Sequence, residues 1–200
     1  MAVRAVFFDA GETLVDETRM WASVADAVGV PQLTFFGILG ALAARGESHR
    51  RVFTLLGVEP VAASGWDERD LYPDAKPCLE ALRARGLRIG VVGNTGRQAE
   101  ALFAGLGVDV VGSSEGWGVE KPSPAFFARV VAEAEAPAAE VAYVGDRIDN
   151  DVVPAAEAGM VAVHILRGPW GYGQADWPET SLAHARITSL AELPEVLRAL

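Results

Sequence analysis

Near its start the chain reads Val3-Arg4-Ala5-Val6-Phe7-Phe8-Asp9-Ala10-Gly11-Glu12-Thr13-Leu14-Val15, an apolar run that ends in an aspartate. Parallel strands covered on both faces have such uninterrupted apolar sequences, and open α/β sheets bind ligands beyond the carboxyl ends of their strands. The pattern therefore predicts a buried strand with Asp9 at its end, in a place suited to chemistry. An ordinary turn or a helix cap is the alternative interpretation, because Asp before a glycine is common in turns.

Further apolar runs follow the first, and helical patterns of ten or more residues separate most of them. This alternation predicts an α/β fold with a parallel sheet flanked by helices. The predicted strands are residues 5–8, 87–92, 108–111, 141–144 and 161–165. The predicted helices include residues 74–85, 97–106, 124–135, 151–158 and 189–200.

A long segment separates the first two predicted strands. Residues 16–71 have helical apolar spacing with no strand pattern, which predicts a helical insertion that leaves the sheet after Asp9 and returns near Pro73. Residues 168–178 are rich in Gly and Pro and are predicted to form a loop. The aromatic residues of that loop either line a pocket or pack on the core.

Composition limits the classes of function. The single cysteine, Cys78, excludes an intrachain disulfide and a thiolate zinc cluster, and its apolar neighbours predict that it is buried. A net charge of -10 without a basic cluster argues against a nucleic-acid partner. No segment approaches the roughly twenty apolar residues that span a membrane, and no signal-peptide pattern is found, so a cytoplasmic protein is predicted.

A second predicted strand ends in acids, in the sequence Tyr143-Val144-Gly145-Asp146-Arg147-Ile148-Asp149-Asn150-Asp151. Crowded carboxylates repel one another unless a cation offsets their charge, and oxygen ligands of this kind suit Mg²⁺. The pattern does not fit an EF-hand, because the Gly and Glu positions of that loop are absent. A solvated turn in which Asp151 caps the next helix is the alternative.

Two further segments contain candidate site residues. Lys121 lies just before a predicted helix, in a chain with fifteen Arg and two Lys, and a compact ammonium suits a phosphate or a carboxylate nucleophile. The sequence Gly93-Asn94-Thr95-Gly96 ends another strand, where backbone N–H groups at a helix N-terminus can receive an anion. A surface lysine and a plain strand-to-helix turn are the respective alternatives.

A serine hydrolase is a different class of enzyme to consider. The segment from Gly112 to Gly116 matches the Gly-x-Ser-x-Gly motif, and His164 and His184 are possible bases. The motif must lead from a strand directly into a helix, and the glycines and proline that follow argue against a helix there. We therefore expect His164 to be a buried core residue and His49 to lie on the surface of the insertion.

Taken together, these features resemble the haloacid dehalogenase superfamily of hydrolases over nearly the whole chain. Members have a nucleophilic Asp after the first strand, a Ser or Thr with Asn after a later strand, a Lys before a helix, and Gly-Asp-x4-Asp after another strand. The matching positions here are Asp9, Gly93-Asn94, Lys121, and Asp146 with Asp151. The resemblance implies a Rossmann-like core of residues 1–15 and 72–200 with a small helical cap, residues 16–71.

Two positions depart from the pattern of the family's phosphatases. The second Asp of Asp-x-Asp, which serves as general acid and base, is Gly11, and the Ser or Thr that grips the phosphoryl group is Gly93. Thr95 lies two residues beyond Gly93 and is a candidate replacement for the hydroxyl. Glu12, which replaces the family's usual Gly, and Asp16 are candidate replacements for the acid.

The resemblance implies a Mg²⁺-dependent phosphatase that acts on a small phosphorylated metabolite through an aspartyl-phosphate. Asp9 is the predicted nucleophile and Lys121 the catalytic cation. Asp9, the Gly11 carbonyl, Asp146 and Asp151 are the predicted metal site, and Gly93, Asn94, Thr95 and Glu12 the predicted substrate-binding residues. The family's dehalogenases also lack the second Asp and need no metal, so a 2-haloacid dehalogenase is one alternative. A non-catalytic binding protein of the same fold is another.

Overall fold

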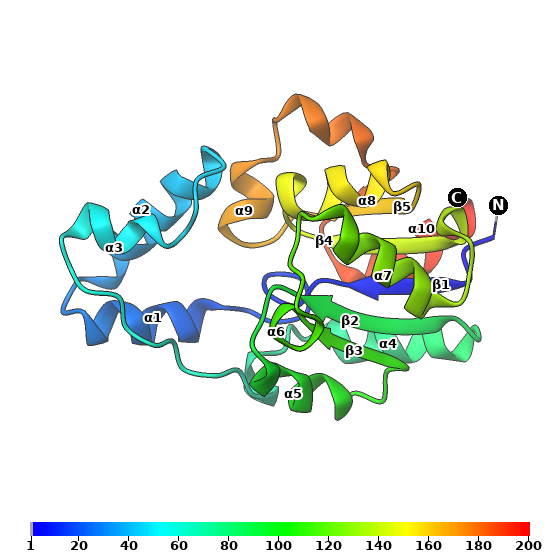
Figure 1. Ribbon diagram of the computed structural model, residues 1–200, viewed down its shortest axis with the longest axis horizontal. Coiled ribbons are helices and arrows are strands. Elements are labelled where there is room, and N and C mark those ends of the chain that lie inside the picture. Colours follow the sequence, from blue (N-terminus) through cyan, green and yellow to red (C-terminus); the bar gives the residue numbers. More distant parts are fainter. Residues whose placement is uncertain (1) are drawn as a thin grey trace.

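The computed structural model describes residues 2–200. Its centre is a parallel sheet, with helices on both faces and a helical insertion beyond one edge (Figure 1). Within the described residues the sheet has six strands, in the order β3-β2-β1-β4-β5-β6. The strands are β1 (Ala5–Phe8), β2 (Arg88–Gly93), β3 (Val110–Ser113), β4 (Val141–Gly145), β5 (Val161–Ile165) and β6 (Ala185–Ile187). The predicted fold class is confirmed.

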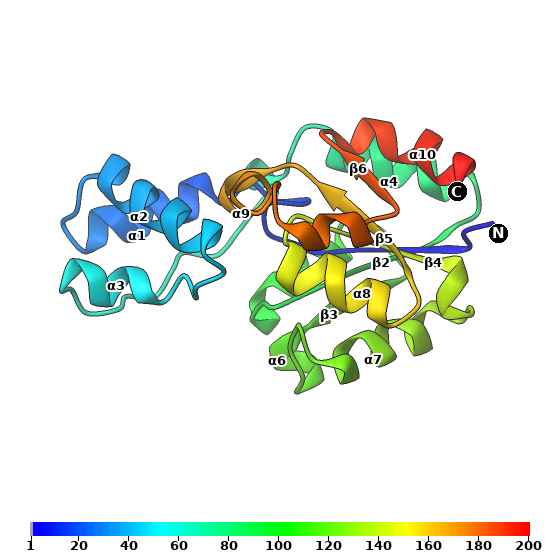
Figure 2. The same ribbon diagram turned by 90° about the horizontal axis from the view of Figure 1, so that it is seen from above.

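The helices divide between the two faces of the sheet and the insertion. Figure 2 shows α4 and α10 on one face of the sheet and α7 and α8 on the other. The helices are α1 (Thr18–Ala27), α2 (Gln32–Ala44), α3 (Arg51–Leu56), α4 (Ala75–Ala84), α5 (Glu100–Ala104), α6 (Ser114–Trp117), α7 (Pro124–Ala134), α8 (Val153–Glu157), α9 (Gly168–Gly173) and α10 (Leu193–Ala199).

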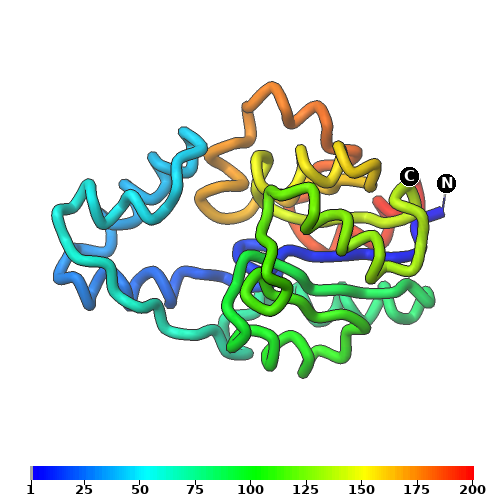
Figure 3. The backbone as a smooth tube through the Cα atoms, viewed as in Figure 1, coloured from blue at the N-terminus to red at the C-terminus, as the bar shows by residue number. Residues whose placement is uncertain are grey.

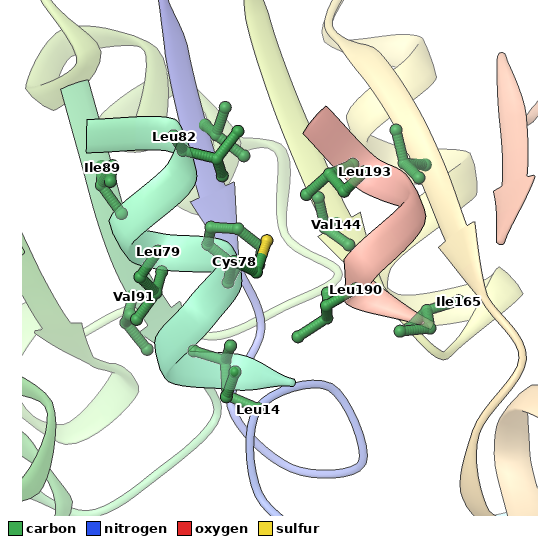
Figure 4. Close-up of a cluster of buried hydrophobic side chains, with 14 of the residues drawn as sticks. Leu14, Cys78, Leu79, Leu82, Ile89, Val91, Val144, Ile165, Leu190 and Leu193 are labelled. Atoms are coloured by element: carbon green, nitrogen blue, oxygen red, sulfur yellow. The ribbon is translucent and has the colours of Figure 1, made fainter. Parts of the chain in front are cut away.

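Side chains of β1 alternate between two buried layers, as the pleat of a strand requires. Phe8 belongs to the layer under α4 and α10, whereas Phe7 belongs to the layer under α7 and α8. Figure 4 shows the first layer, where Leu79 and Leu82 of α4 lie close to strand side chains such as Val91. Burial on both faces explains why the strand sequence is apolar without interruption.

The carboxyl ends of the three central strands lie at the same level. Phe8 is paired with Val91 of β2 and with Val144 of β4. Asp9 therefore lies at the middle of the sheet edge, with the ends of β2 and β4 on either side, where ligands bind in open α/β sheets.

The inserted helices α1–α3 form a hydrophobic cluster of their own. It contains Trp21, Phe35, Leu39 and Phe53, and Trp170 of α9 packs into it from the core side. The two chain segments that connect the insertion to the sheet run together, with Asp16 N donating to Asp70 O at 2.7 Å and Tyr72 N to Leu14 O at 2.9 Å. Figure 3 shows the insertion extending away from the sheet between these connections. The division into two domains at these boundaries stays a prediction.

The predicted loop at residues 168–178 was wrong in its first half, which forms α9. Gly168 has a φ of 57° and Pro169 occupies the first turn, so the residues typical of loops here start a helix. A Cβ at Gly171 would lie 2.9 Å from Ile165 O, and one at Gly173 would lie 3.1 Å from Ala44 N. Glycine is present because α9 packs closely against β5 and α2, which local sequence does not reveal.

Several boundaries also differ from the sequence predictions. The edge strand β6 was missed because its three residues are too short for a periodic pattern. The predicted helix 97–106 begins with a 3-10 turn, Arg97–Ala99, and a π-helical turn, Ile148–Val152, precedes α8. Within residues 2–200, no single helix is long and apolar enough to cross a membrane; α1 and α2 meet that test only as a pair, across a bend of 117°.

Gly90 lies in β2 beneath the Phe7 ring, and a Cβ at Gly90 would overlap that ring. We expect Gly90→Ala to destabilise the protein by about 1–3 kcal/mol, because overpacking a dense core forces side chains out of their preferred positions. Gly37→Ala is the matched control: this exposed site within α2 has no atom within 4 Å of an added Cβ, and we expect a gain of about 0.5–1 kcal/mol. Urea unfolding of both variants measures the difference, and equal effects would contradict this view of the core.

Candidate active site

Asp9, Lys121 and Asp151 form a buried ion-pair network at the end of the sheet. Lys121 Nζ lies 2.6 Å from Asp9 Oδ1 and 2.5 Å from Asp151 Oδ1. The side chains of Lys121 and Asp151 are 1% exposed, and that of Asp9 is 12% exposed. One ammonium therefore orients two carboxylates that come from the ends of different strands.

The charges of this network determine its ionisation. Burial alone lowers the pKa of Lys121, but the adjacent Asp151 and Asp9 outweigh burial and hold that pKa well above its ordinary value. Lys121 is therefore a permanent cation beside Asp9. Burial raises the pKa of Asp151, and the Lys121 charge opposes that rise.

Two glycines make room for the carboxylates. A Cβ at Gly93 would lie 2.7 Å from Asp9 Oδ1, and one at Gly145 would overlap the Asp151 carboxyl group. The glycine at position 93, which departs from the family's Ser or Thr, thus leaves room for Asp9 Oδ1 where the structure places it. A hydroxyl side chain there would displace the carboxylate of Asp9.

Asn94 fastens the Lys121 backbone to the end of β2. Its amide nitrogen donates to Lys121 O at 2.9 Å, and its Oδ1 accepts from Lys121 N at 2.8 Å. Both polar ends of the Asn94 side chain are engaged, so its observed contacts position Lys121. Asn94 and Thr95 also line the adjoining cavity, and their predicted contacts with substrate stay predictions.

Asp146 is the third acid of the cluster. Ligand oxygens of Asp9, Asp146 and Asp151 lie within 4.8 Å of one another. In residues 2–200 no Lys or Arg forms an ion pair with Asp146, which is 2% exposed. Burial, together with the charges of Asp151 and Asp9, raises the pKa of Asp146 well above its ordinary value. Three carboxyl groups thus lie around one ammonium, and the charge of Arg147 opposes the rise in the pKa of Asp146 only in part.

The neighbours of Asp146 have structural contacts. Asp149 turns away from the cluster and pairs with Arg147, whose Nη2 lies 2.8 Å from Asp149 Oδ2. His164 is fully buried, as predicted, and its Nε2 lies 2.9 Å from Asp146 O. Burial lowers the pKa of His164 to about 4, so it is neutral at pH 7.

Glu12 has a left-handed backbone conformation, with a φ of 51°. Its Oε2 accepts from Tyr72 Oη at 2.6 Å and its Oε1 accepts from Glu17 N at 3.0 Å. Burial raises the pKa of Glu12. Because this conformation is unfavourable for a residue with a side chain, these two hydrogen bonds hold a strained position, and both carboxylate oxygens are used.

Glu17 was missed by the sequence predictions, which named Asp16 as a nearby acid. Asp16 Oδ1 accepts from Thr18 N at 2.8 Å, a local contact at the start of α1. Glu17 instead lies over Gly11, where a Cβ would be 2.6 Å from Glu17 Oε1. Burial, followed by the charge of Glu12, raises the pKa of Glu17 to about 8. No local pattern reveals this contact, because it depends on the turn in which Glu12 N donates to Val15 O at 2.7 Å.

A cavity of about 540 Å³ lies between the sheet edge and the insertion. Asp9, Lys121 and Asp146 line it on the core side, and Trp21 and His49 line it on the insertion side. The predicted surface position of His49 was wrong, because its ring is half-buried, 5.5 Å from the Trp21 ring. Burial lowers the pKa of His49 to about 4.

The Gly-x-Ser-x-Gly motif does not form a catalytic site in the described residues. A short helix, α6, does follow β3, so the prediction that no helix forms there was wrong. Ser114 Oγ donates to Thr95 O at 3.3 Å, while His184 Nδ1 accepts from Ala162 N at 3.2 Å. The serine and the two histidines thus have separate contacts, which removes the basis for a serine hydrolase.

The two lysines of the chain provide a test of the buried network. We expect Lys121→Gln to destabilise the protein by about 3–5 kcal/mol, because it leaves two carboxylates without a cation. Lys76→Gln removes an exposed ion pair, 2.7 Å from Glu68, and we expect a loss below about 1 kcal/mol. Urea denaturation without added metal measures both, and a loss below 1 kcal/mol at Lys121 would contradict the network.

Comparison with curated proteins finds phosphatases among the similar chains. The chain is 37% identical over 133 residues to glyceraldehyde 3-phosphate phosphatase of Methanocaldococcus jannaschii. The aligned region covers 64% of this chain and 56% of that protein. It is 38% identical over 147 residues to glyceraldehyde 3-phosphate phosphatase of Methanopyrus kandleri, with 62% of each chain covered. The chain thus spans less than two thirds of the length of these relatives.

Solved structures share the fold. A HAD phosphatase from Thermococcus onnurineus has a TM-score of 0.65 at 24% identity, with 98% of both chains covered. The L-2-haloacid dehalogenase of Xanthobacter autotrophicus has a TM-score of 0.70 at 20% identity, with 99% of both chains covered. The family model of haloacid dehalogenase-like hydrolases matches residues 21–159, more than half of the sequence. With the acids, lysine and sheet edge described above, this match shows that the chain belongs to the haloacid dehalogenase-like hydrolase family.

Proposed function

We propose that the protein is a Mg²⁺-dependent phosphatase that acts on a small phosphorylated metabolite. The observation that carries the proposal is the Asp9 carboxylate, held by Lys121 Nζ at 2.6 Å on the floor of a cavity. A carboxylate there is a candidate nucleophile for a phosphorus atom, and a fixed cation beside it reduces the repulsion between the nucleophile and a phosphate.

Asp9 attacks phosphorus, and the bond between phosphorus and the leaving oxygen breaks, which leaves an aspartyl-phosphate. Lys121 stabilises the negative charge of the transferring phosphoryl group. Asn94 keeps Lys121 in place through its two backbone hydrogen bonds. Water then attacks phosphorus, releases inorganic phosphate and restores the Asp9 carboxylate.

The acidic cluster fits a divalent cation. Asp146 is a buried carboxylate without an ion-pair partner in the described residues, and its oxygens lie within reach of those of Asp9 and Asp151. Asp9, Asp146 and the Gly11 carbonyl are the proposed Mg²⁺ ligands. Asp151 supports the site indirectly, because it accepts a hydrogen bond from Lys121 Nζ. When bound, the ion shields the approach of two anions, the nucleophile and the phosphate.

The size of the substrate follows from the cavity and the insertion. Residues 16–71 are proposed to act as a cap, because Trp21 and His49 of this segment line the same cavity as Asp9, on the side away from the sheet. A volume of about 540 Å³ suits a small metabolite. The two relatives named as glyceraldehyde 3-phosphate phosphatases support a short phosphorylated carbon chain as the substrate class.

A metal-independent 2-haloacid dehalogenase is the second candidate. The glycine at position 11 favours it, because the family's dehalogenases also lack the second Asp. The environment of Asp146 argues against it, since Asp146 is a buried carboxyl group with no ion-pair partner in the described residues and with two further acids beside it, which favours a bound divalent cation.

Asp9→Asn removes the nucleophile and keeps the shape of the side chain, so we expect turnover to be lost with little change in melting temperature. The assay uses p-nitrophenyl phosphate, glyceraldehyde 3-phosphate and 2-chloropropionate, each with Mg²⁺ and with a chelator. Phosphate release that requires Mg²⁺ and Asp9 supports the phosphatase. Chloride release in the presence of chelator would instead establish the dehalogenase, and full activity of the variant would end both mechanisms.

Asp146→Asn tests the metal without any substrate. We expect the metal-free variant to melt above the wild-type protein, because the substitution removes a buried acid that has no ion-pair partner and lies beside two other acids. Saturation with Mg²⁺ at about 100 times its dissociation constant stabilises the wild-type protein by about 2.7 kcal/mol, and we expect the variant to lose most of this gain. Asp149→Asn, in the same turn but paired with Arg147, is the control that should keep it; an equal Mg²⁺ response in both variants would contradict the site.

A further inference from the structure

Breaking an alkyl phosphate ester needs a proton on the leaving oxygen, because alkoxides leave poorly, and Gly11 supplies none. This question rests on the proposed phosphatase function. Besides Asp9 and Asp146, the acids that line the cavity are Glu12 and Glu17. One of these two carboxyl groups is therefore the candidate proton donor.

Glu12 is unsuited to the role. Tyr72 Oη and Glu17 N occupy its two carboxylate oxygens, at 2.6 Å and 3.0 Å. Its side chain also packs against Gly168, where an added Cβ would overlap the Glu12 carboxyl group. Proton transfer from Glu12 would require the loss of contacts that hold its left-handed backbone.

Glu17 is differently placed. Trp21 Nε1 donates to its Oε2 at 3.1 Å, which anchors one oxygen. Within residues 2–200, no protein hydrogen bond engages Oε1, the oxygen that faces Gly11. A Cβ at position 11 would lie 2.6 Å from this oxygen and 2.9 Å from the carboxyl carbon of Glu17. The Glu17 carboxyl group thus fills the space that a side chain at position 11 would occupy, two residues from Asp9.

We propose that Glu17, carried by the first residues of the insertion, is the general acid and base of this site. As the bond between phosphorus and the ester oxygen breaks, its electron pair stays on that oxygen, which takes the proton of the Glu17 carboxyl group and leaves as an alcohol. The Glu17 carboxylate then accepts a proton from the water that attacks the aspartyl-phosphate. The bond between phosphorus and Asp9 breaks, and inorganic phosphate leaves with Glu17 protonated again.

Glu17→Gln tests this role because the amide keeps the size of the side chain and cannot deliver the proton. Alkoxides leave poorly and nitrophenolate leaves well, so loss of an acid affects alkyl esters most. We expect the ratio of turnover on glyceraldehyde 3-phosphate to that on p-nitrophenyl phosphate to fall by about tenfold or more. Asp16→Asn, which keeps an oxygen for Thr18 N, is the matched control and should keep the wild-type ratio.

Two further measurements distinguish an acid from a metal ligand or a packing residue. The rise in melting temperature on adding Mg²⁺ should be the same in Glu17→Gln as in the wild-type protein. The double variant Gly11→Asp/Glu17→Ala should recover alkyl turnover relative to Glu17→Ala, because removal of Glu17 opens the space that Asp needs. Gly11→Asp alone should not gain, because its side chain collides with Glu17.

The outcomes separate this proposal from the function on which it rests. An unchanged ratio in a folded Glu17→Gln variant, beside a wild-type protein that hydrolyses both esters, would overturn the role of Glu17 and leave the phosphatase intact. Loss of the Mg²⁺ response in Glu17→Gln would overturn it in favour of a metal ligand. Absence of any Mg²⁺-dependent hydrolysis by the wild-type protein would overturn the proposed function and this role together.

Discussion

The rest of the site depends on one buried cation, the ammonium of Lys121 between the carboxylates of Asp9 and Asp151. Two acids at this depth would repel each other, whereas a shared ammonium offsets that repulsion and fixes the direction of the Asp9 carboxylate. The residues around Lys121, Asp9 and Asp151 leave space for these three side chains and hold them in place. Gly93 and Gly145 leave space for the carboxylates, and Asn94 holds the lysine by its backbone.

The ion pairs of Lys121 with Asp9 and Asp151 also bear on the divalent metal site that we propose. Lys121 is engaged with two acids, so Asp146 has no ion-pair partner in the described part of the chain, and only the charge of Arg147 opposes the rise in its pKa. The same arrangement supports the proposed phosphoryl chemistry over metal-free displacement, although the absence of a second Asp at position 11 is also a feature of the family's dehalogenases. The inserted helices also contribute to the site, because Trp21 and His49 line the cavity on the side opposite the sheet edge.

The segment from Gly11 to Glu17 shows how a missing side chain is compensated within one turn. Gly11 has no side chain, and the carboxyl group of Glu17 lies in the space beside it. Glu12 adopts a left-handed backbone conformation in this turn and is held there by Tyr72 and by the Glu17 N–H group. The strain at Glu12 and the position of Glu17 are therefore parts of one arrangement, which links the loop after Asp9 to the start of α1.

The sequence by itself determined the parallel α/β core, the helical character of residues 16–71, and the spacing of Asp9, Lys121, Asp146 and Asp151. These follow from local chemistry, since buried parallel strands are apolar throughout and acids at their ends face a common edge. Only the tertiary structure decided which acids meet. It paired Asp149 with Arg147, used Asn94 to hold Lys121, made a helix of the glycine-rich Gly168–Gly173, and brought His49 into the cavity. It also placed Glu17 over Gly11, because a contact between these two residues depends on how the backbone between them bends, and no periodic pattern in the sequence records that bend.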